Sequence, residues 1–190
     1  MDPHHHFVLG GQRSGKSRRA EALASAWLGT PGREAVLVAT ASAGDAEMAG
    51  RIAVHRRDRA GRGAGLATVE EPRALAAALR GCAAPQRLVI VDCLTLWLTN
   101  LLMPIAGPAV DADTLGSAID DLSLALRGAA GPVVLVSNEI GLGLTPLSRE
   151  ARRFVDELGR LHQRVAAHCA DVTLMVGGLE VAVKRGAHAG

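Results

Sequence analysis

A glycine-rich octapeptide near the start of the chain constrains the fold more than any other stretch. Residues 10–17 read GGQRSGKS, follow the short apolar run 7–9 and precede an Ala- and Leu-rich helical pattern over 18–28. Two glycines separated by four residues and followed by Lys and Ser have the spacing of a phosphate-binding loop. Glycine adopts backbone angles that a Cβ blocks, so successive N–H groups can turn toward one anion at the positive end of the next helix. We therefore predict that the chain binds a nucleoside triphosphate.

The residues of this loop have separate expected tasks. Lys16 is expected to reach the outer phosphates, and the Ser17 hydroxyl is expected to bind Mg²⁺. The predicted nucleotide contacts of the loop are Gly10, Gly11, Gln12, Arg13, Ser14, Gly15, Lys16 and Ser17.

Composition bears on size and partners. A chain of 190 residues predicts one domain over residues 1–190. Because 48% of the residues are hydrophobic and only 2% are aromatic, the core must consist largely of Ala, Val and Leu. A net charge of +2 is too small to indicate a nucleic-acid partner by itself.

Cysteine usage and the first residues bear on the compartment. Cys82, Cys93 and Cys169 form no Cys-x-x-Cys pair, which favours buried thiols in a reducing compartment. No apolar run has membrane-spanning length, and the first residues lack a signal-peptide pattern, so we expect a cytoplasmic protein. For His4–His6, a solvated terminus is favoured over a metal site or a cloning remnant.

Apolar runs alternate with helical patterns along the rest of the chain. The runs 34–41, 88–92 and 133–137 are typical of strands covered on both faces. The runs 172–176 and 179–183 predict a C-terminal hairpin across two glycines. The pattern predicts an α/β fold with a mostly parallel sheet and helices on both faces, and its ligands at the carboxyl ends of the strands. A further short strand is expected over 67–69, and further helices over 45–59, 72–80, 94–103, 113–127 and 148–169.

Two residues outside the phosphate loop are candidates for chemistry. Asp92 ends an apolar strand, which favours an Mg²⁺-binding role, although an Asp that caps the helix from Leu94 has the same pattern. His55 lies on the apolar face of the predicted helix over 45–59, where a histidine is more often a packing residue. Neighbouring arginines would lower the pKa of an imidazole, favour its nucleophilic form and neutralise a polyphosphate leaving group. These arginines are Arg51, Arg56, Arg57, Arg59 and Arg62, with Asp58 opposing them.

Taken together, several segments resemble a known family. From Gly10 to about Lys184 the chain resembles the bifunctional adenosylcobinamide kinase/adenosylcobinamide-phosphate guanylyltransferases of cobalamin biosynthesis. Besides the phosphate loop, the resemblance rests on Ala39-Thr40-Ala41, on the residues from Asp45 to His55 with Arg51-Ile52-x-x-His55, on Thr68-x-Glu70-x-Pro72, on Asp92-Cys93-Leu94-Thr95, on Thr99 to Leu102, on Ser137-Asn138-Glu139-Ile140-Gly141-Leu142-Gly143, and on Ala151 to Phe154 and Gly159 to Leu161.

This resemblance implies more than the spacing does. It implies a RecA-like P-loop fold, Mg²⁺, GTP or ATP as co-substrates, and assembly as a homo-oligomer, specifically a trimer. It implies that His55 takes up GMP, and that the transferase step converts adenosylcobinamide phosphate to adenosylcobinamide-GDP. The positions implied at the nucleotide site are Thr40, Ala41, Ser42, Arg56, Arg57, Asp58, Arg59, Glu70 and Asp92.

The chain also departs from the family at two places. Leu144 to Ser148 replace a stretch that is often Ile-Val-Pro-Glu-Asn, and His162 stands where Asn is frequent. His162 and His168 are not expected to form a metal pair, because six residues place them on different helical faces.

Three functions follow, in decreasing order of support. The first is the bifunctional enzyme, in which His55 becomes guanylylated. The second is a small-molecule P-loop kinase without guanylyltransferase activity, in which His55 is a packing residue. The third, a nucleic-acid-binding ATPase, is disfavoured by the scarcity of stacking aromatics and the small net charge. The residues alone do not indicate ATP or GTP for the kinase step, or how the corrinoid is bound.

Overall fold

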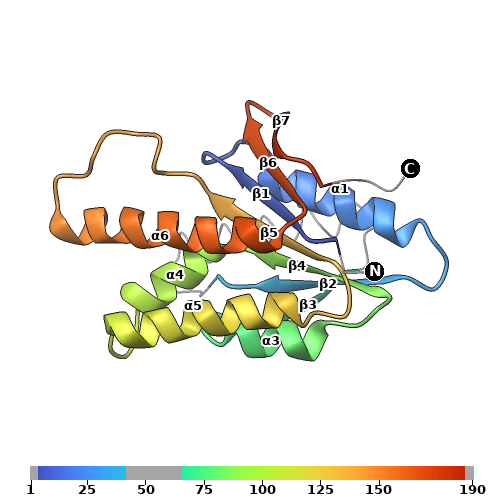
Figure 1. Ribbon diagram of the computed structural model, residues 1–190, viewed down its shortest axis with the longest axis horizontal. Helices are drawn as coiled ribbons and strands as arrows, with labels where there is room; N and C mark the ends of the chain where they lie inside the picture. The colour runs from blue at the N-terminus through green and yellow to red at the C-terminus, as the bar shows by residue number, and fades with distance from the viewer. Residues whose placement is uncertain (1–3, 42–65, 187–190) are drawn as a thin grey trace.

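The computed structural model describes residues 4–41 and 66–186. Within them, strands and helices alternate along most of the chain (Figure 1). The elements are β1 (His6–Gly10), α1 (Lys16–Leu28), β2 (Glu34–Ala39), β3 (Ala67–Glu70), α3 (Leu75–Cys82), β4 (Arg87–Asp92), α4 (Leu94–Leu102), α5 (Ala112–Arg127), β5 (Val133–Asn138), α6 (Arg149–His168), β6 (Asp171–Val176) and β7 (Leu179–Lys184).

These strands form one seven-stranded sheet with the order β3-β2-β4-β5-β1-β6-β7. Every neighbouring pair is parallel except β6 and β7, which form an antiparallel hairpin. The predicted α/β class, with a mostly parallel sheet and a C-terminal hairpin, is therefore confirmed. The strand that carries the phosphate loop, β1, lies between β5 and β6, although these strands come more than 120 residues later in the chain.

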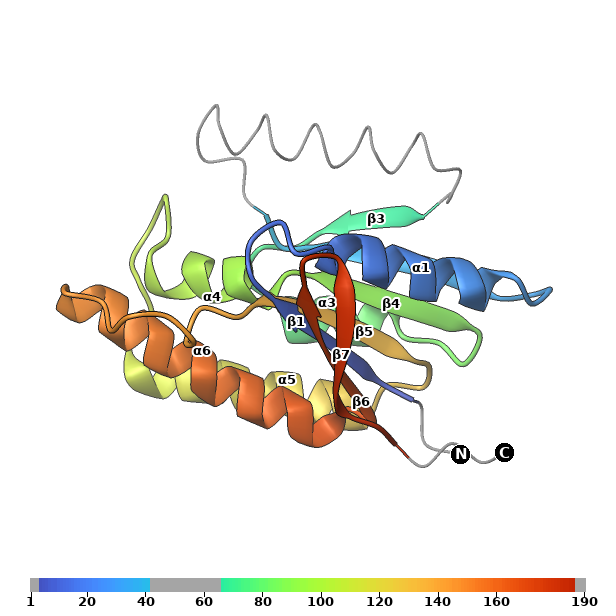
Figure 2. The same cartoon turned by 90° about the horizontal axis from the view of Figure 1, so that it is seen from above.

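Helices cover both faces of the sheet, as predicted. Successive residues of a strand point to opposite faces. Phe7 accordingly packs in the core beneath α3 to α6, whereas Val8 packs in the core beneath α1. Figure 2 shows α1 on one side of the strands and α5 and α6 on the other. Cys82, Cys93 and Cys169 are buried free thiols, as predicted.

Side-chain caps explain where α5 and α6 begin. The Ser148 hydroxyl accepts a hydrogen bond from the N–H of Ala151, so α6 begins at Arg149. The predicted start of α3 at Pro72 is wrong, because the helix begins at Leu75. Just before the helix, the Glu71 carboxylate accepts hydrogen bonds from the N–H groups of residues 73 and 74 at 2.9 and 2.8 Å. These bonds hold residues 71–74 in a turn outside the helix. None of the helices in the described residues is long and apolar enough to cross a bilayer.

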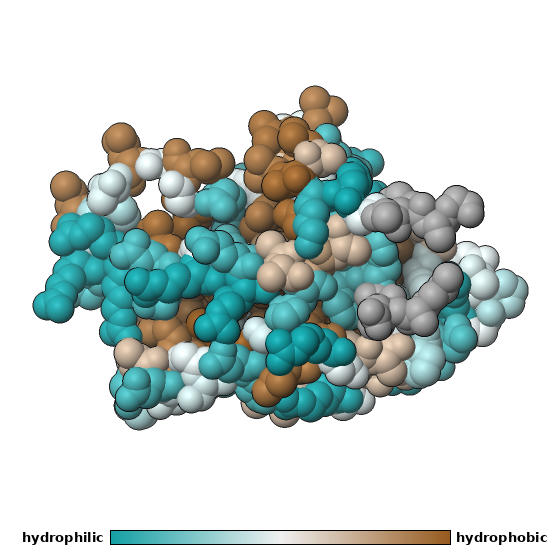
Figure 3. Space-filling view, in the orientation of Figure 1, coloured by the Kyte–Doolittle hydropathy of each residue, from teal (hydrophilic) through white to brown (hydrophobic). Residues whose placement is uncertain are grey.

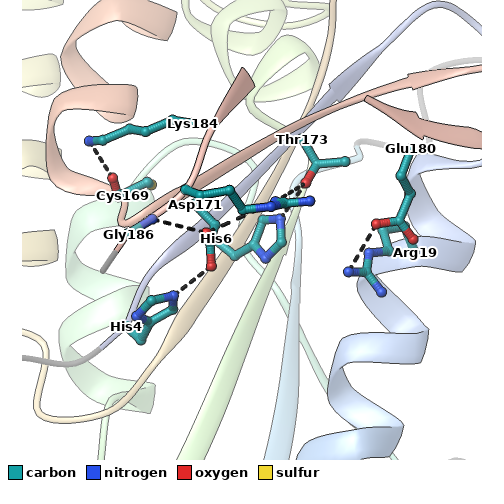
Figure 4. Close-up of polar contacts among 10 residues, drawn as sticks. His4, His6, Arg19, Cys169, Asp171, Thr173, Glu180, Lys184 and Gly186 are labelled. Carbon is teal, nitrogen blue, oxygen red and sulfur yellow. Dashed lines mark hydrogen bonds and ion pairs between the residues drawn. The ribbon is translucent and has the colours of Figure 1, made fainter. Parts of the chain in front are cut away.

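The expectation of a solvated terminus is wrong for His5 and His6, although His4 is exposed. His5 and His6 are buried, since β1 is an internal strand of the sheet. His5 Nε2 lies 2.9 Å from the carbonyl oxygen of Leu126, and His6 Nε2 lies 2.8 Å from Thr173 Oγ1. Figure 4 shows His6 beside Thr173, and His4 bonded to the carboxylate of Asp171.

Burial of His6 predicts that the protein loses stability in acid. Burial is the largest influence on its imidazole and lowers the pKa from 6.5 to about 4. The unfolded chain therefore takes up a proton below about pH 6.5 that the folded protein refuses, so the free energy of unfolding falls as the pH drops from 6.5 to 4. Between pH 7 and 4.5, wild type should lose roughly 2 kcal/mol more than His6→Gln. Urea unfolding at both pH values measures this difference, and equal losses in the two proteins would contradict it.

Side-chain contacts attach the C-terminal hairpin to the rest of the fold (Figure 4). Arg19 on α1 forms an ion pair with Glu180 on β7 at 3.0 Å. Lys184 donates to the carbonyl oxygen of Cys169 at 2.6 Å. The hairpin turn also reaches the phosphate loop, because the N–H of Gly178 donates to the carbonyl oxygen of Ser14 at 3.1 Å.

Candidate nucleotide-binding site

The phosphate loop joins β1 to α1 and depends on glycine at both ends. Gly10 has a φ of +153° and Gly15 a φ of +102°, which L side chains rarely adopt. A Cβ on Gly10 would lie 2.5 Å from the carbonyl oxygen of Met175 on the neighbouring β6. The loop therefore requires glycine there because the adjacent strand is too close for a side chain.

Polar groups of the loop are buried where an anion would bind. Lys16 is buried and donates from Nζ to the carbonyl oxygen of Gly11 at 2.6 Å. Burial lowers the pKa of Lys16, and the acidic groups of Cys93 and Asp92 oppose this. The Ser14 hydroxyl is also buried and has no hydrogen-bond partner among the described residues. A bound phosphate would give both Lys16 and Ser14 an acceptor.

Ser17 and Asp92 lie in contact, as the predicted Mg²⁺ site requires. The Ser17 hydroxyl donates to Asp92 Oδ2 at 3.0 Å. The two residues meet although β5 lies between β1, which precedes the phosphate loop, and β4, which ends at Asp92. Asp92 does not cap α4, because Cys93 is the N-cap residue of that helix and no side chain caps it. Hydroxyl and carboxylate oxygens are the ligands that Mg²⁺ prefers, so the residues present fit this ion. Burial raises the pKa of the adjacent Cys93 thiol to about 12, which excludes it as a nucleophile at neutral pH.

The other predicted nucleotide-site residues that the structure describes lie at the ends of β2 and β3. Thr40 is fully buried, and its hydroxyl donates to the carbonyl oxygen of Cys93 and accepts from the N–H of the same residue. Ala41 follows it and is half-buried. Glu70 is exposed at the end of β3, four strand positions from β1 and therefore about 19 Å along the sheet from the phosphate loop. Thr40 thus links the end of β2 to Asp92 and the phosphate loop, and Glu70 lies farther along the same edge of the sheet.

The remaining predicted site residues belong to the segment that follows Ala41. His55 lies outside the described residues, and so do Ser42, Arg56, Arg57, Asp58 and Arg59. Ala41 and Leu66 flank this segment, which therefore joins β2 to β3. The roles of these residues stay predictions.

The structure adds residues to which the sequence assigned no role. In the pairing of β1 with β5, Gly10 lies opposite Asn138, and the N–H of Glu139 donates to the carbonyl oxygen of Gly10 at 2.9 Å. The buried His162 of α6 lies behind them, with Nε2 2.8 Å from Ser137 Oγ and Nδ1 3.5 Å from Glu139 Oε2. Burial lowers the pKa of His162, and the Glu139 carboxylate opposes this. Polar residues at the carboxyl end of a buried parallel strand were the available signal for Asn138 and Glu139.

An exposed apolar loop follows β5 at the carboxyl end of this strand. Leu142, Leu144 and Leu147 are 81, 98 and 98% exposed. Figure 3 shows apolar side chains over this loop and over the β6–β7 hairpin. Such a surface is typical of contact with a large apolar ligand or another protein.

Comparison with known sequences gives matches over nearly the whole chain. The family model "Cobinamide kinase / cobinamide phosphate guanyltransferase" matches residues 6–183. The bifunctional adenosylcobalamin biosynthesis protein CobP of Pseudomonas aeruginosa is 49% identical over 178 residues, which is 94% of this chain and 96% of that protein. The corresponding protein CobU of Salmonella typhimurium is 39% identical over 186 residues, 94% of this chain and 98% of that protein.

Solved structures with a similar fold are much more distant in sequence. The flagellar accessory protein FlaH of Methanocaldococcus jannaschii has a TM-score of 0.51 at 13% identity and covers 97% of this chain and 80% of its own. A protein of Pyrococcus horikoshii OT3 has a TM-score of 0.55 at 8% identity, with coverage of 96% and 86%. At these identities the similarity is one of fold.

Proposed function

Since this chain belongs to the cobinamide kinase / cobinamide phosphate guanyltransferase family, we propose that it catalyses both reactions named for that family. It phosphorylates the aminopropanol hydroxyl of adenosylcobinamide with a nucleoside triphosphate. It then transfers GMP from GTP to the product, which gives adenosylcobinamide-GDP. The observation that carries this proposal is the family match over residues 6–183, which includes the whole phosphate loop.

In the kinase step the phosphate loop holds and orients the triphosphate. Its backbone N–H groups and the Ser14 hydroxyl donate to phosphate oxygens. The Lys16 ammonium leaves its hydrogen bond to the Gly11 carbonyl oxygen and donates to the outer phosphates instead. Ser17 and Asp92 would hold Mg²⁺, which when bound neutralises charge on the phosphate oxygens. Most of the rate gain in such a step comes from positioning and charge neutralisation.

In the transferase step His55 is the nucleophile. The neutral imidazole attacks the α-phosphorus of GTP, a P–N bond forms, and the bond to pyrophosphate breaks. A phosphate oxygen of adenosylcobinamide phosphate then displaces the imidazole, so the P–N bond breaks and the histidine is regenerated. Arg56, Arg57 and Arg59, with Asp58 among them, neutralise the polyphosphate.

The residues at the ends of β2 and β3 serve the remainder of the nucleotide. Thr40 and Ala41 follow β2, and Thr40 is bonded to Asp92 and Cys93 at the end of the neighbouring β4, whereas Glu70 ends β3 farther from the phosphate loop. We assign them to nucleotide contacts beyond the phosphates.

Mass spectrometry after incubation with GTP and Mg²⁺ tests the transferase assignment. The expected result is an acid-labile mass increment of one GMP on the peptide that contains His55. Absence of any adduct, with phosphorylation of adenosylcobinamide retained, would instead support a P-loop kinase without guanylyltransferase activity.

Asp92→Asn tests the Mg²⁺ assignment. Loss of the carboxylate charge beside Ser17 should weaken the apparent Mg²⁺ affinity and lower kinase activity by about 10- to 100-fold. Titration of Mg²⁺ in the kinase assay measures this change. Asp156→Asn, which removes an exposed carboxylate from α6, is the matched control. An unchanged Mg²⁺ requirement in Asp92→Asn would exclude Asp92 from the metal site.

We further propose that the protein is cytoplasmic and assembles as a trimer, as the family resemblance implies. Light scattering on the purified protein measures its mass, and a monomer at assay concentration would contradict the trimer.

A further inference from the structure

A chain of hydrogen-bonding side chains lies behind the phosphate loop and connects α4, β5 and α6. Ser137 Oγ lies 2.8 Å from His162 Nε2 and 3.0 Å from Thr95 Oγ1, and the N–H of Asn138 donates to Thr95 Oγ1 at 2.8 Å. Ser137 is fully buried and His162 is nearly so. Because unpaired polar groups are costly when buried, this series of hydrogen bonds constrains which atom carries each proton.

One assignment of donors and acceptors satisfies every contact in this series of hydrogen bonds. Thr95 accepts from Asn138 and donates to Ser137, and the Ser137 hydroxyl donates to His162 Nε2. The ring proton then lies on Nδ1, which faces Glu139 Oε2 at 3.5 Å. The opposite tautomer would place a nitrogen lone pair against the carboxylate, which is unfavourable.

This arrangement orients the carboxylate of a residue whose backbone is bonded to the phosphate loop. Glu139 Oε1 accepts the N–H of Gly141 at 2.6 Å, and Oε2 faces His162. The Glu139 backbone is bonded to Gly10, the first residue of the phosphate loop. Its side chain is still 21% exposed, so a substrate can reach it. A residue needed only to close the turn at Gly141 would use one oxygen, whereas here the second oxygen also has a buried donor aimed at it.

We propose that Glu139 is the general base of the kinase step and that His162 is its positioning residue. The inference rests on the proposed function. The hydroxyl oxygen of the substrate attacks the γ-phosphorus, and the bond between that phosphorus and the β-phosphate oxygen breaks, which releases a nucleoside diphosphate. The hydroxyl proton passes to the Glu139 carboxylate and then to solvent. The transferase step needs no such base, because its nucleophile is a neutral imidazole.

Glu139→Gln separates the two reactions. The amide keeps an oxygen for the N–H of Gly141 but does not take up a proton, so kinase kcat should fall by about 100-fold or more. Covalent labelling by α-labelled GTP should stay within about threefold of wild type. Glu150→Gln, an exposed carboxylate in the first turn of α6, is the matched control and should retain both reactions.

The outcomes of this experiment are distinct. Kinase activity retained in Glu139→Gln would overturn the inference alone, and so would loss of both reactions, which would indicate a role in holding the nucleotide. A wild-type protein that does not phosphorylate adenosylcobinamide would overturn the proposed function and this inference with it.

Two substitutions at His162 test the positioning role. Asn can accept from Ser137 and still present an N–H toward Glu139, whereas Leu fills the space without a donor. We expect His162→Leu to lower kinase kcat about tenfold with the KM for nucleotide unchanged, and His162→Asn to stay within about threefold of wild type. Equal kinase rates in folded Leu and Asn variants, with folding checked by circular dichroism, would show that His162 only fills the core.

Discussion

His55→Asn is expected to abolish covalent GMP labelling and guanylyl transfer while phosphorylation of adenosylcobinamide survives. An asparagine amide does not displace pyrophosphate, so the covalent intermediate does not form and the transfer rate should fall by at least about 10⁴-fold. The kinase step that we propose uses the phosphate loop, Lys16 and Asp92, which this change leaves in place. Two assays measure the result: labelling of the protein by α-labelled GTP, and conversion of adenosylcobinamide to its phosphate.

A second histidine provides the control for this experiment. His168→Asn removes an imidazole from the last turn of α6 and should leave both reactions within about twofold of wild type. Full guanylyl transfer by His55→Asn would remove His55 from the mechanism. Loss of both reactions in that variant would show that the two steps share the residue.

Lys16→Met is expected to disable both reactions. Methionine has a similar length and apolar stem but no charge, so the loop loses the cation that we assign to the outer phosphates. We expect kinase kcat to fall by about 10³-fold and GMP labelling to fall with it. Nucleotide affinity, measured by calorimetry, should weaken by at least about tenfold, since the Lys16 charge also contributes to ground-state binding.

Arg127→Gln is the charge-matched control for this variant. It removes one exposed positive charge at the end of α5 and should leave nucleotide affinity unchanged. Normal GMP labelling in Lys16→Met would mean that the transferase step binds its GTP independently of the phosphate loop.

Local sequence signals were sufficient for features that a short segment determines by itself. The spacing of residues 10–17 predicted the loop, and an apolar run that ends in Asp predicted the position of Asp92 at the end of β4. Two glycines between apolar runs likewise predicted the β6–β7 hairpin. These features depend on backbone angles and periodicity, which neighbouring residues determine.

Features that depend on strand order were not predictable in the same way. His5 and His6 are buried because β1 lies between two strands from the far end of the chain, and no local pattern of three histidines indicates that. Glu139 and His162 meet because β5 pairs with β1 and α6 packs over both. A histidine on an apolar helical face could equally fill the core, so only the contacts of His162 with Ser137 and Glu139 distinguish the two roles.

The bond from the Gly178 N–H to the Ser14 carbonyl has a consequence for biosynthesis of the protein. The phosphate loop is translated among the first residues, yet its supporting turn and both strands that flank β1 are translated in the last third of the chain. A ribosome-bound nascent chain would therefore carry an unsupported glycine-rich segment until nearly all of the polypeptide has emerged. Products of premature termination before residue 178 should consequently bind nucleotide less tightly than the full chain.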